Sequence, residues 1–113
     1  MNIELLEKHA DEDVQLLFFL SCLPGGAKAE QLSQMLGRDI KKGLAILDDL
    51  AFLESDDLSK RKLTPYMCNY CNVTLANQER EGSKAKASYV KTICKFYRDV
   101  LKSSFLLIGR VFP

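Results

Sequence analysis

Apolar residues recur at helical spacing through the first half of the chain. Residues 11–23 would be apolar on most sides of a helix. The run begins with three acids, which are favoured at a helix N-terminus, and Pro24-Gly25-Gly26 ends it. Helical spacing returns over 28–36, and again over 39–50, where Asp39 is the expected N-cap. The pattern therefore predicts a core helix followed by a helix-turn-helix.

The middle of the chain has the pattern of a β-hairpin. Two short runs, 52–55 and 60–64, flank a polar link at 56–59. Pro65 ends the second run and suits the first turn of a helix, which is expected over 66–81. We expect the inner face of that helix to carry Tyr66, Met67, Tyr70, Val73 and Thr74.

A last amphipathic helix is expected from Ala85 onward, after the break at 82–84. Its predicted inner stripe is Tyr89, Ile93, Phe96, Val100 and Leu101. The chain ends in the strongly apolar stretch 105–113, which favours a chain cut out of something longer. The prediction is a mainly α chain with a small β-hairpin: a lead-in (1–10), a winged helix-turn-helix core (11–81) and a C-terminal helical extension (82–113).

Composition and charge narrow the class of protein. The 113 residues, 47% of them hydrophobic, suit one globular domain, and no apolar run approaches the ~20 residues that a spanning helix needs. The N-terminus lacks the basic and apolar regions of a signal peptide, so we expect a cytoplasmic protein without membrane partners. The net charge of +1 combines an acidic segment 1–59 with a basic segment 60–113.

The cysteines leave three interpretations open. Cys68 and Cys71 form a C-x-x-C pair, which can bind zinc, carry redox chemistry or simply pack. Structural zinc needs four ligands, and a second pair is missing, while His9 is the only histidine. Free cysteine behaves as a small hydrophobe, so packing is favoured and no metal is expected.

Three segments resemble one family of proteins. Residues 17–26 (LFFLSCLPGG) look like the L-x-x-L-S-x-L-P-G-G stretch that opens the winged helix of STAND-class NTPases, the NB-ARC and NACHT proteins. Residues 46–53 (ILDDLAFL) resemble the family's run ahead of the hairpin, and 63–70 (LTPYMCNY) resemble its L-H-P-L-V-x-x-Y signature. Similar proteins continue into helical repeats, often of tetratricopeptide type.

The resemblance implies a regulatory module in nucleotide signalling rather than an enzyme. In such proteins the winged helix packs on the nucleotide-binding domain and helps to hold the ADP-bound resting state. The partners implied are that domain and the helical repeats of the same parent protein. The family's histidine contacts a nucleotide phosphate, and this chain has Thr64 there, which offers one hydroxyl hydrogen bond or is an ordinary strand residue.

No catalytic set is expected in this chain. It has no G-x-x-x-x-G-K-[ST] loop, so ADP or ATP would enter only through a parent nucleotide-binding domain. The interaction candidates are the wing, the hairpin exit and the glycine corner: Lys60, Arg61, Lys62, Pro65, Pro24, Gly25 and Gly26.

A free-standing DNA-binding regulator is the alternative, and a plain adaptor module is a third. DNA-binding winged helices place long polar side chains in the major groove. Here the helix expected over 39–50 offers Lys41 and Lys42 beside Asp48 and Asp49, so DNA is not the expected partner.

Overall fold

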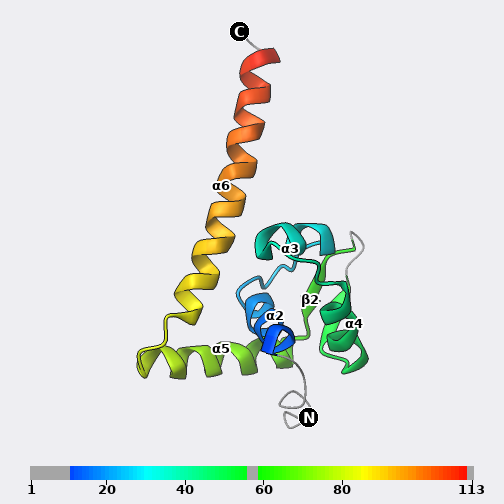
Figure 1. The fold of residues 1–113 in the computed structure, drawn as a ribbon, viewed down its shortest axis with the longest axis vertical. Helices are drawn as coiled ribbons and strands as arrows, with labels where there is room; N and C mark the ends of the chain where they lie inside the picture. The colour runs from blue at the N-terminus through cyan, green and yellow to red at the C-terminus, as the bar shows by residue number, and fades with distance from the viewer. Residues whose placement is uncertain (1–10, 56–58, 112–113) are drawn as a thin grey trace.

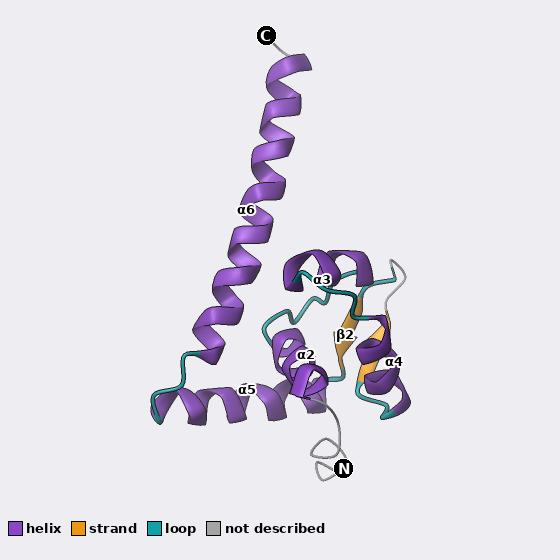
Figure 2. Cartoon of the chain, viewed as in Figure 1, coloured by secondary structure: helices purple, strands orange, loops and turns teal. Residues whose placement is uncertain are grey.

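The computed structural model describes residues 11–55 and 59–111, with side chains placed for 12–55 and 59–103. This part of the chain is mainly helical with one two-stranded antiparallel hairpin, as the pattern predicts (Figure 1, Figure 2). The elements are α2 (Asp11–Ser21), α3 (Ala29–Leu36), α4 (Lys41–Asp49), β1 (Leu53–Ser55), β2 (Arg61–Leu63), α5 (Pro65–Arg80) and α6 (Ala85–Val111). The predicted lead-in 1–10 and most of the predicted hairpin link, 56–58, lie outside the described residues.

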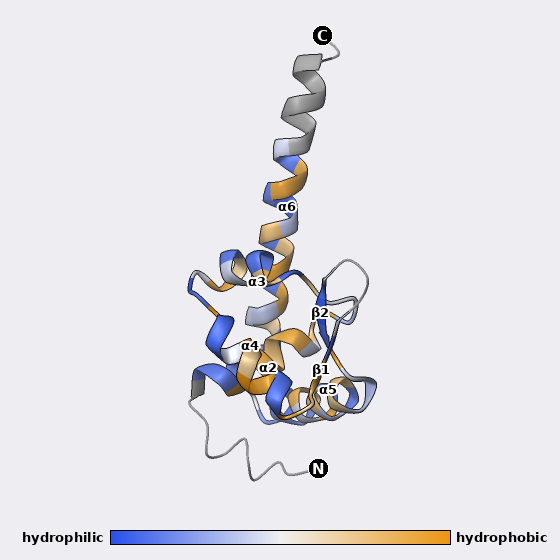
Figure 3. Ribbon diagram, turned by 90° about the vertical axis from the view of Figure 1, so that its right-hand side faces the viewer, coloured by the Kyte–Doolittle hydropathy of each residue, from blue (hydrophilic) through white to orange (hydrophobic). Residues whose placement is uncertain are grey.

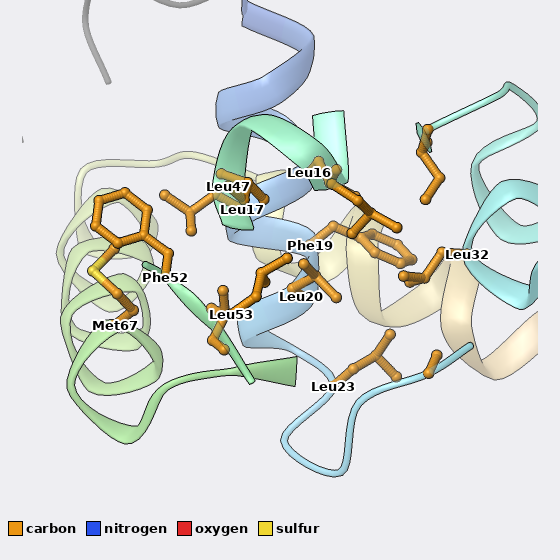
Figure 4. Close-up of a cluster of buried hydrophobic side chains, with 14 of the residues drawn as sticks. Leu16, Leu17, Phe19, Leu20, Leu23, Leu32, Leu47, Phe52, Leu53 and Met67 are labelled. Atoms are coloured by element: carbon orange, nitrogen blue, oxygen red, sulfur yellow. The ribbon is translucent and has the colours of Figure 1, made fainter. Parts of the chain in front are cut away.

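Helix α2 is the centre of the core. Its leucines and Phe19 point toward α3, α4 and the hairpin (Figure 4). Each fully buried side chain of this size contributes about 1.5–3 kcal/mol. The buried apolar residues of α3, α4, β1, β2 and α5 include Leu32, Met35, Leu44, Leu47, Leu53, Leu63, Met67 and Cys71. The predicted core helix is therefore confirmed as the element on which the others pack.

The turn between α3 and α4 differs in one detail from the expectation. Gly37 closes α3 in the left-handed conformation, with φ of 68°. Asp39 is not the N-cap residue of α4, because Ile40 holds that position. The Asp39 carboxylate still accepts a hydrogen bond from the first helical N–H, that of Lys41, at 3.0 Å. The capping interaction thus comes from the predicted residue, Asp39, which lies one position before the N-cap residue Ile40.

The hairpin packs one face on the core. Leu53 lies opposite Leu63 and both are buried, while the exposed Glu54 lies opposite Lys62. An isolated bridge between Ala27 and Arg61 adds the segment between α2 and α3 to the edge of β2. The predicted two-stranded wing is therefore present, and it is held by its core-facing leucines and by the bridge at the edge of β2.

Helix α5 buries a stripe that matches the predicted one only in part: Met67 is buried and Tyr70 packs partly against the core, as expected. Tyr66 and Val73 are 67% and 53% exposed. The buried residues are Met67, Cys71 and Leu75, which recur every fourth position. Pro65 at the first turn sets the phase of the helix from the end of β2, and the small Cys71 packs inward, in line with the packing interpretation of the cysteines.

Only the first half of α6 packs against the core, and the rest extends away from it (Figure 1). Tyr89 meets Phe19 edge to face, with ring centroids 5.9 Å apart, and Ile93 and Phe96 continue the contact. The prediction that Val100 and Leu101 lie inward is wrong, since both are exposed beyond the reach of the core. In the described part of the chain, no helix combines the length and apolarity needed to cross a membrane.

Candidate functional site: the wing and the glycine corner

The fold joins two of the predicted sites. The Gly26 N–H donates to the Leu23 carbonyl at 2.8 Å, which turns the chain after α2. This turn places Gly26 directly beneath β2: a Cβ at Gly26 would lie 2.6 Å from the Arg61 carbonyl oxygen and 2.8 Å from the Lys62 Cβ. Next to it, Ala27 and Arg61 exchange backbone hydrogen bonds of 2.8 and 3.1 Å. The glycine corner and the wing therefore form one continuous unit.

The remaining corner residues face outward. Pro24 and Gly25 are both exposed, and a Cβ at Gly25 would meet nothing within 4 Å. They are the part of the corner that another molecule can reach. Gly26, in contrast, is buried and serves the contact with β2.

Arg61 reaches back to the helix-turn-helix instead of out to solvent. Its Nη2 lies 3.1 Å from the Oδ1 of Asp48 on α4, and its side chain is only 25% exposed. The Nε of Arg61 is buried and, within the described part of the chain, has no hydrogen-bond partner. The charge of the central wing cation is thus offset within the domain by an acid of the helix that a DNA-binding protein would use.

Lys60 comes directly before β2 and Lys62 is the central residue of the strand, and both side chains are partly buried. Lys62 lies opposite Glu54 in the hairpin register, and opposite charges across a ladder contribute roughly 0.2–1 kcal/mol. The wing therefore presents mixed charge rather than an uninterrupted basic surface.

Thr64 and Pro65 connect the wing to α5. The Thr64 N–H donates to the Phe52 carbonyl at 3.0 Å, and its carbonyl accepts from the Cys68 N–H at 2.9 Å. Thr64 is the N-cap residue of α5, but its hydroxyl makes no capping hydrogen bond. Pro65 is exposed at the first helical position. The hydroxyl of Thr64 is therefore not committed to the helix end that its backbone forms.

The outer face of α4 carries charges of both signs. Lys41, Lys42, Asp48 and Asp49 are all exposed. A shallow groove of about 250 Å³ runs between α4 and β2, and the Asp48–Arg61 pair lies in its wall. Gly43 is buried on the opposite side of α4, where a Cβ would lie 2.9 Å from a Leu16 methyl group. Glycine at this position thus permits the close approach of α4 to α2.

The burial of Cys68 and Cys71 agrees with packing, the preferred interpretation of the C-x-x-C pair. Cys71 is fully buried, and Cys22 and Cys68 are partly buried beside it. Burial, and then the neighbouring Cys68 and Cys22, raise the pKa of the Cys71 thiol to about 12. A thiol that stays protonated is a poor nucleophile and a poor metal ligand. Among the described residues, no group of three or more histidine, cysteine or acidic side chains is arranged to hold a metal ion.

Two features escaped the sequence pattern. The partner of Arg61 was not predicted, because Asp48 is distant in sequence and no local spacing rule links a helix acid to a wing cation. The second is an exposed apolar stripe on α6, in which Val90 and Tyr97 were not predicted and Leu101 was assigned to the other stripe. The residues of this stripe recur every three or four positions, which the sequence shows. They lie next to the stripe of Tyr89 and Ile93 on the helix, so the two were not separated.

Comparison with known proteins adds no further constraint, since no family model, curated protein or solved structure matches the chain. The function has to be argued from the residues and their geometry.

Proposed function

We propose that this chain is a non-catalytic regulatory module, the winged-helix segment of a larger cytoplasmic STAND-type ATPase of the NB-ARC/NACHT kind. In this proposal residues 11–81 form the winged helix and 82–113 begin a helical scaffold. The module docks as a rigid body on the nucleotide-binding domain in one nucleotide state and moves away in the other. ADP or ATP is bound by the parent domain, and Thr64 lies at the position nearest to the phosphate in the family signature.

The observation that carries the proposal is the fused corner and wing. Segment 17–26, which resembles the family, contains the glycine corner, and segment 63–70, which also resembles it, continues from the wing. Backbone hydrogen bonds between Ala27 and Arg61 hold the corner and the wing together. Such a unit has little freedom to change shape internally. It suits a part that transmits the movement of another domain without deforming.

The matching experiment needs the reading frame that encodes the chain. We expect this reading frame to encode a nucleotide-binding domain, marked by a phosphate-binding loop, upstream of the chain. That domain is purified and titrated with this chain by calorimetry. We expect tighter docking to the ADP-loaded domain than to the ATP-analogue-loaded one. Lys62→Glu should weaken docking about tenfold, because it reverses a wing charge, whereas Lys42→Glu on the outer face of α4 should not. Equal affinity in both nucleotide states, or a reading frame without such a domain, would refute the proposal.

DNA binding is the competing function, favoured by the helix order alone. The ion pair between Arg61 and Asp48 argues against DNA binding, because the wing cation best placed to contact a phosphate is already paired with an acid. We expect no salt-dependent binding of the chain to duplex DNA in fluorescence anisotropy at low and moderate salt. Micromolar binding that weakens steeply with added salt would reverse this ranking.

A further inference from the structure

Helix α6 carries an apolar stripe that the described residues leave exposed. Val90, Cys94, Tyr97 and Leu101 follow one another at intervals of three and four residues, so they share one face of the helix. Val90, Tyr97 and Leu101 are 42%, 40% and 57% exposed, and Cys94 is exposed as well. The stripe extends over three turns, roughly 16 Å along the helix axis.

One edge of this stripe is the domain core. At 100° per residue, Tyr89, Ile93 and Phe96 lie on the adjacent face of α6, and these are the residues that pack against the core. Figure 3 shows apolar positions continuing along α6 above the level of α3. A helix lying on the stripe would therefore meet a surface that is already fixed in place on one side.

The other edge is a basic ridge. Lys91, Lys95, Arg98 and Lys102 are all exposed and follow the same interval of three and four residues. Asp99, the single acid among residues 85–103, lies on the side of α6 opposite to the stripe. A partner on the stripe would thus have four cations along one flank.

We propose that this stripe and ridge bind an amphipathic helix of a partner protein whose apolar seam is flanked by acidic residues. Its apolar seam would cover Val90, Tyr97 and Leu101, and its acids would pair with the ridge. This site is distinct from the wing and does not rest on the STAND assignment.

Charge also argues against a second copy of the chain as the occupant. In a two-fold, antiparallel pairing of α6 along the stripe, the ridge of one copy would lie beside the ridge of the other. Facing rows of four cations repel each other. An acidic partner turns the same ridge into an attraction, which is why we assign the site to another protein.

The test uses a designed peptide of three heptads with leucine at the seam and glutamate at both flanking positions, and a matched peptide with lysine at the flanks. Binding to the intact chain is measured by fluorescence anisotropy at low and high salt. We expect the acidic peptide to bind in the micromolar range and to weaken as salt screens the ridge. The lysine peptide should bind at least about tenfold more weakly.

Two pairs of variants localise the site. Leu101→Gln and Arg98→Glu should each weaken the acidic peptide about fivefold or more. Ser103→Gln and Lys42→Glu are the controls: Ser103 is an exposed residue of α6 that lies off the stripe, and Lys42 is an exposed residue of α4. All four positions are exposed, and circular dichroism checks that each variant keeps its fold.

Three outcomes overturn the proposal. The first is failure of the acidic peptide to bind, and the second is equal affinity for both peptides. The third is a dimer in sedimentation velocity that Leu101→Gln dissociates, which would make a second copy the occupant. Loss of nucleotide-dependent docking at the wing would leave this proposal unaffected, so the two can fail separately.

Discussion

At the scale of single residues, the two neighbouring glycines of the corner have opposite roles. Gly26 has a φ of 73° and lies against the backbone of β2, so both its conformation and its space exclude a side chain. Gly25 is exposed with open space around its Cα. Glycine is therefore required at position 26 by the contact between the corner and the wing.

This difference predicts opposite results for the same substitution. Gly26→Ala should lower the free energy of unfolding by about 2 kcal/mol or more, through the left-handed backbone and the contact with the Arg61 carbonyl. Gly25→Ala should change it by less than about 0.5 kcal/mol. Urea denaturation followed by circular dichroism measures both, and equal midpoints would contradict the close contact between corner and wing.

At the scale of elements, α6 is held through a short aromatic and aliphatic seam. Tyr89 contacts Phe19 of α2, and Ile93 and Phe96 extend the contact. Beyond this seam, Val100 and Leu101 are exposed. The attachment of the helical extension thus depends on its first three turns.

We therefore expect Tyr89→Ala to loosen α6 more than the rest of the domain. The substitution should cost about 1–3 kcal/mol, because it removes a partly buried ring and its edge-to-face contact. Tyr97→Ala is the matched control and should cost clearly less, since Tyr97 lies on the exposed stripe. Hydrogen exchange should show faster exchange in α6 than in α2 for Tyr89→Ala, and uniform acceleration of all helices would argue against a separately attached helix.

At the scale of the whole molecule, two thiols and a phenol lie near one another where α2, α5 and α6 meet. They belong to Cys22, Cys71 and Tyr89. Burial raises the pKa of Cys71 to about 12 and also raises the pKa values of Cys22 and Tyr89. All three therefore keep their protons in the folded state at a pH where the unfolded chain releases them. Above about pH 9, the ordinary value for a thiol, the folded state binds more protons than the unfolded state.

Stability should consequently fall as the pH rises above about 9, at up to about 1.4 kcal/mol per pH unit for each group. Denaturation at a series of pH values measures this slope. Cys71→Ala should flatten it, because the substitution removes the thiol that would ionise on unfolding. Identical slopes for the wild type and Cys71→Ala would contradict the assignment.

Much of the candidate site was accessible from the sequence, but its assembly was not. Pro24-Gly25-Gly26 and the wing cations were identified separately, each from composition and punctuation. Their contact depends on the turn at Gly26 and the bridge between Ala27 and Arg61, which are distant in sequence. The pairing of Arg61 with Asp48 likewise requires α4 and β2 to lie side by side.

The sequence by itself determined where the elements begin and end, because these limits depend on local chemistry. Pro24-Gly25-Gly26 stops α2, Gly37 closes α3, and Pro65 starts α5. The tertiary structure alone decided which faces are buried, since burial depends on what lies opposite. Hence α5 turns Cys71 inward and Tyr66 outward, and α6 leaves Leu101 exposed after it passes the edge of the core.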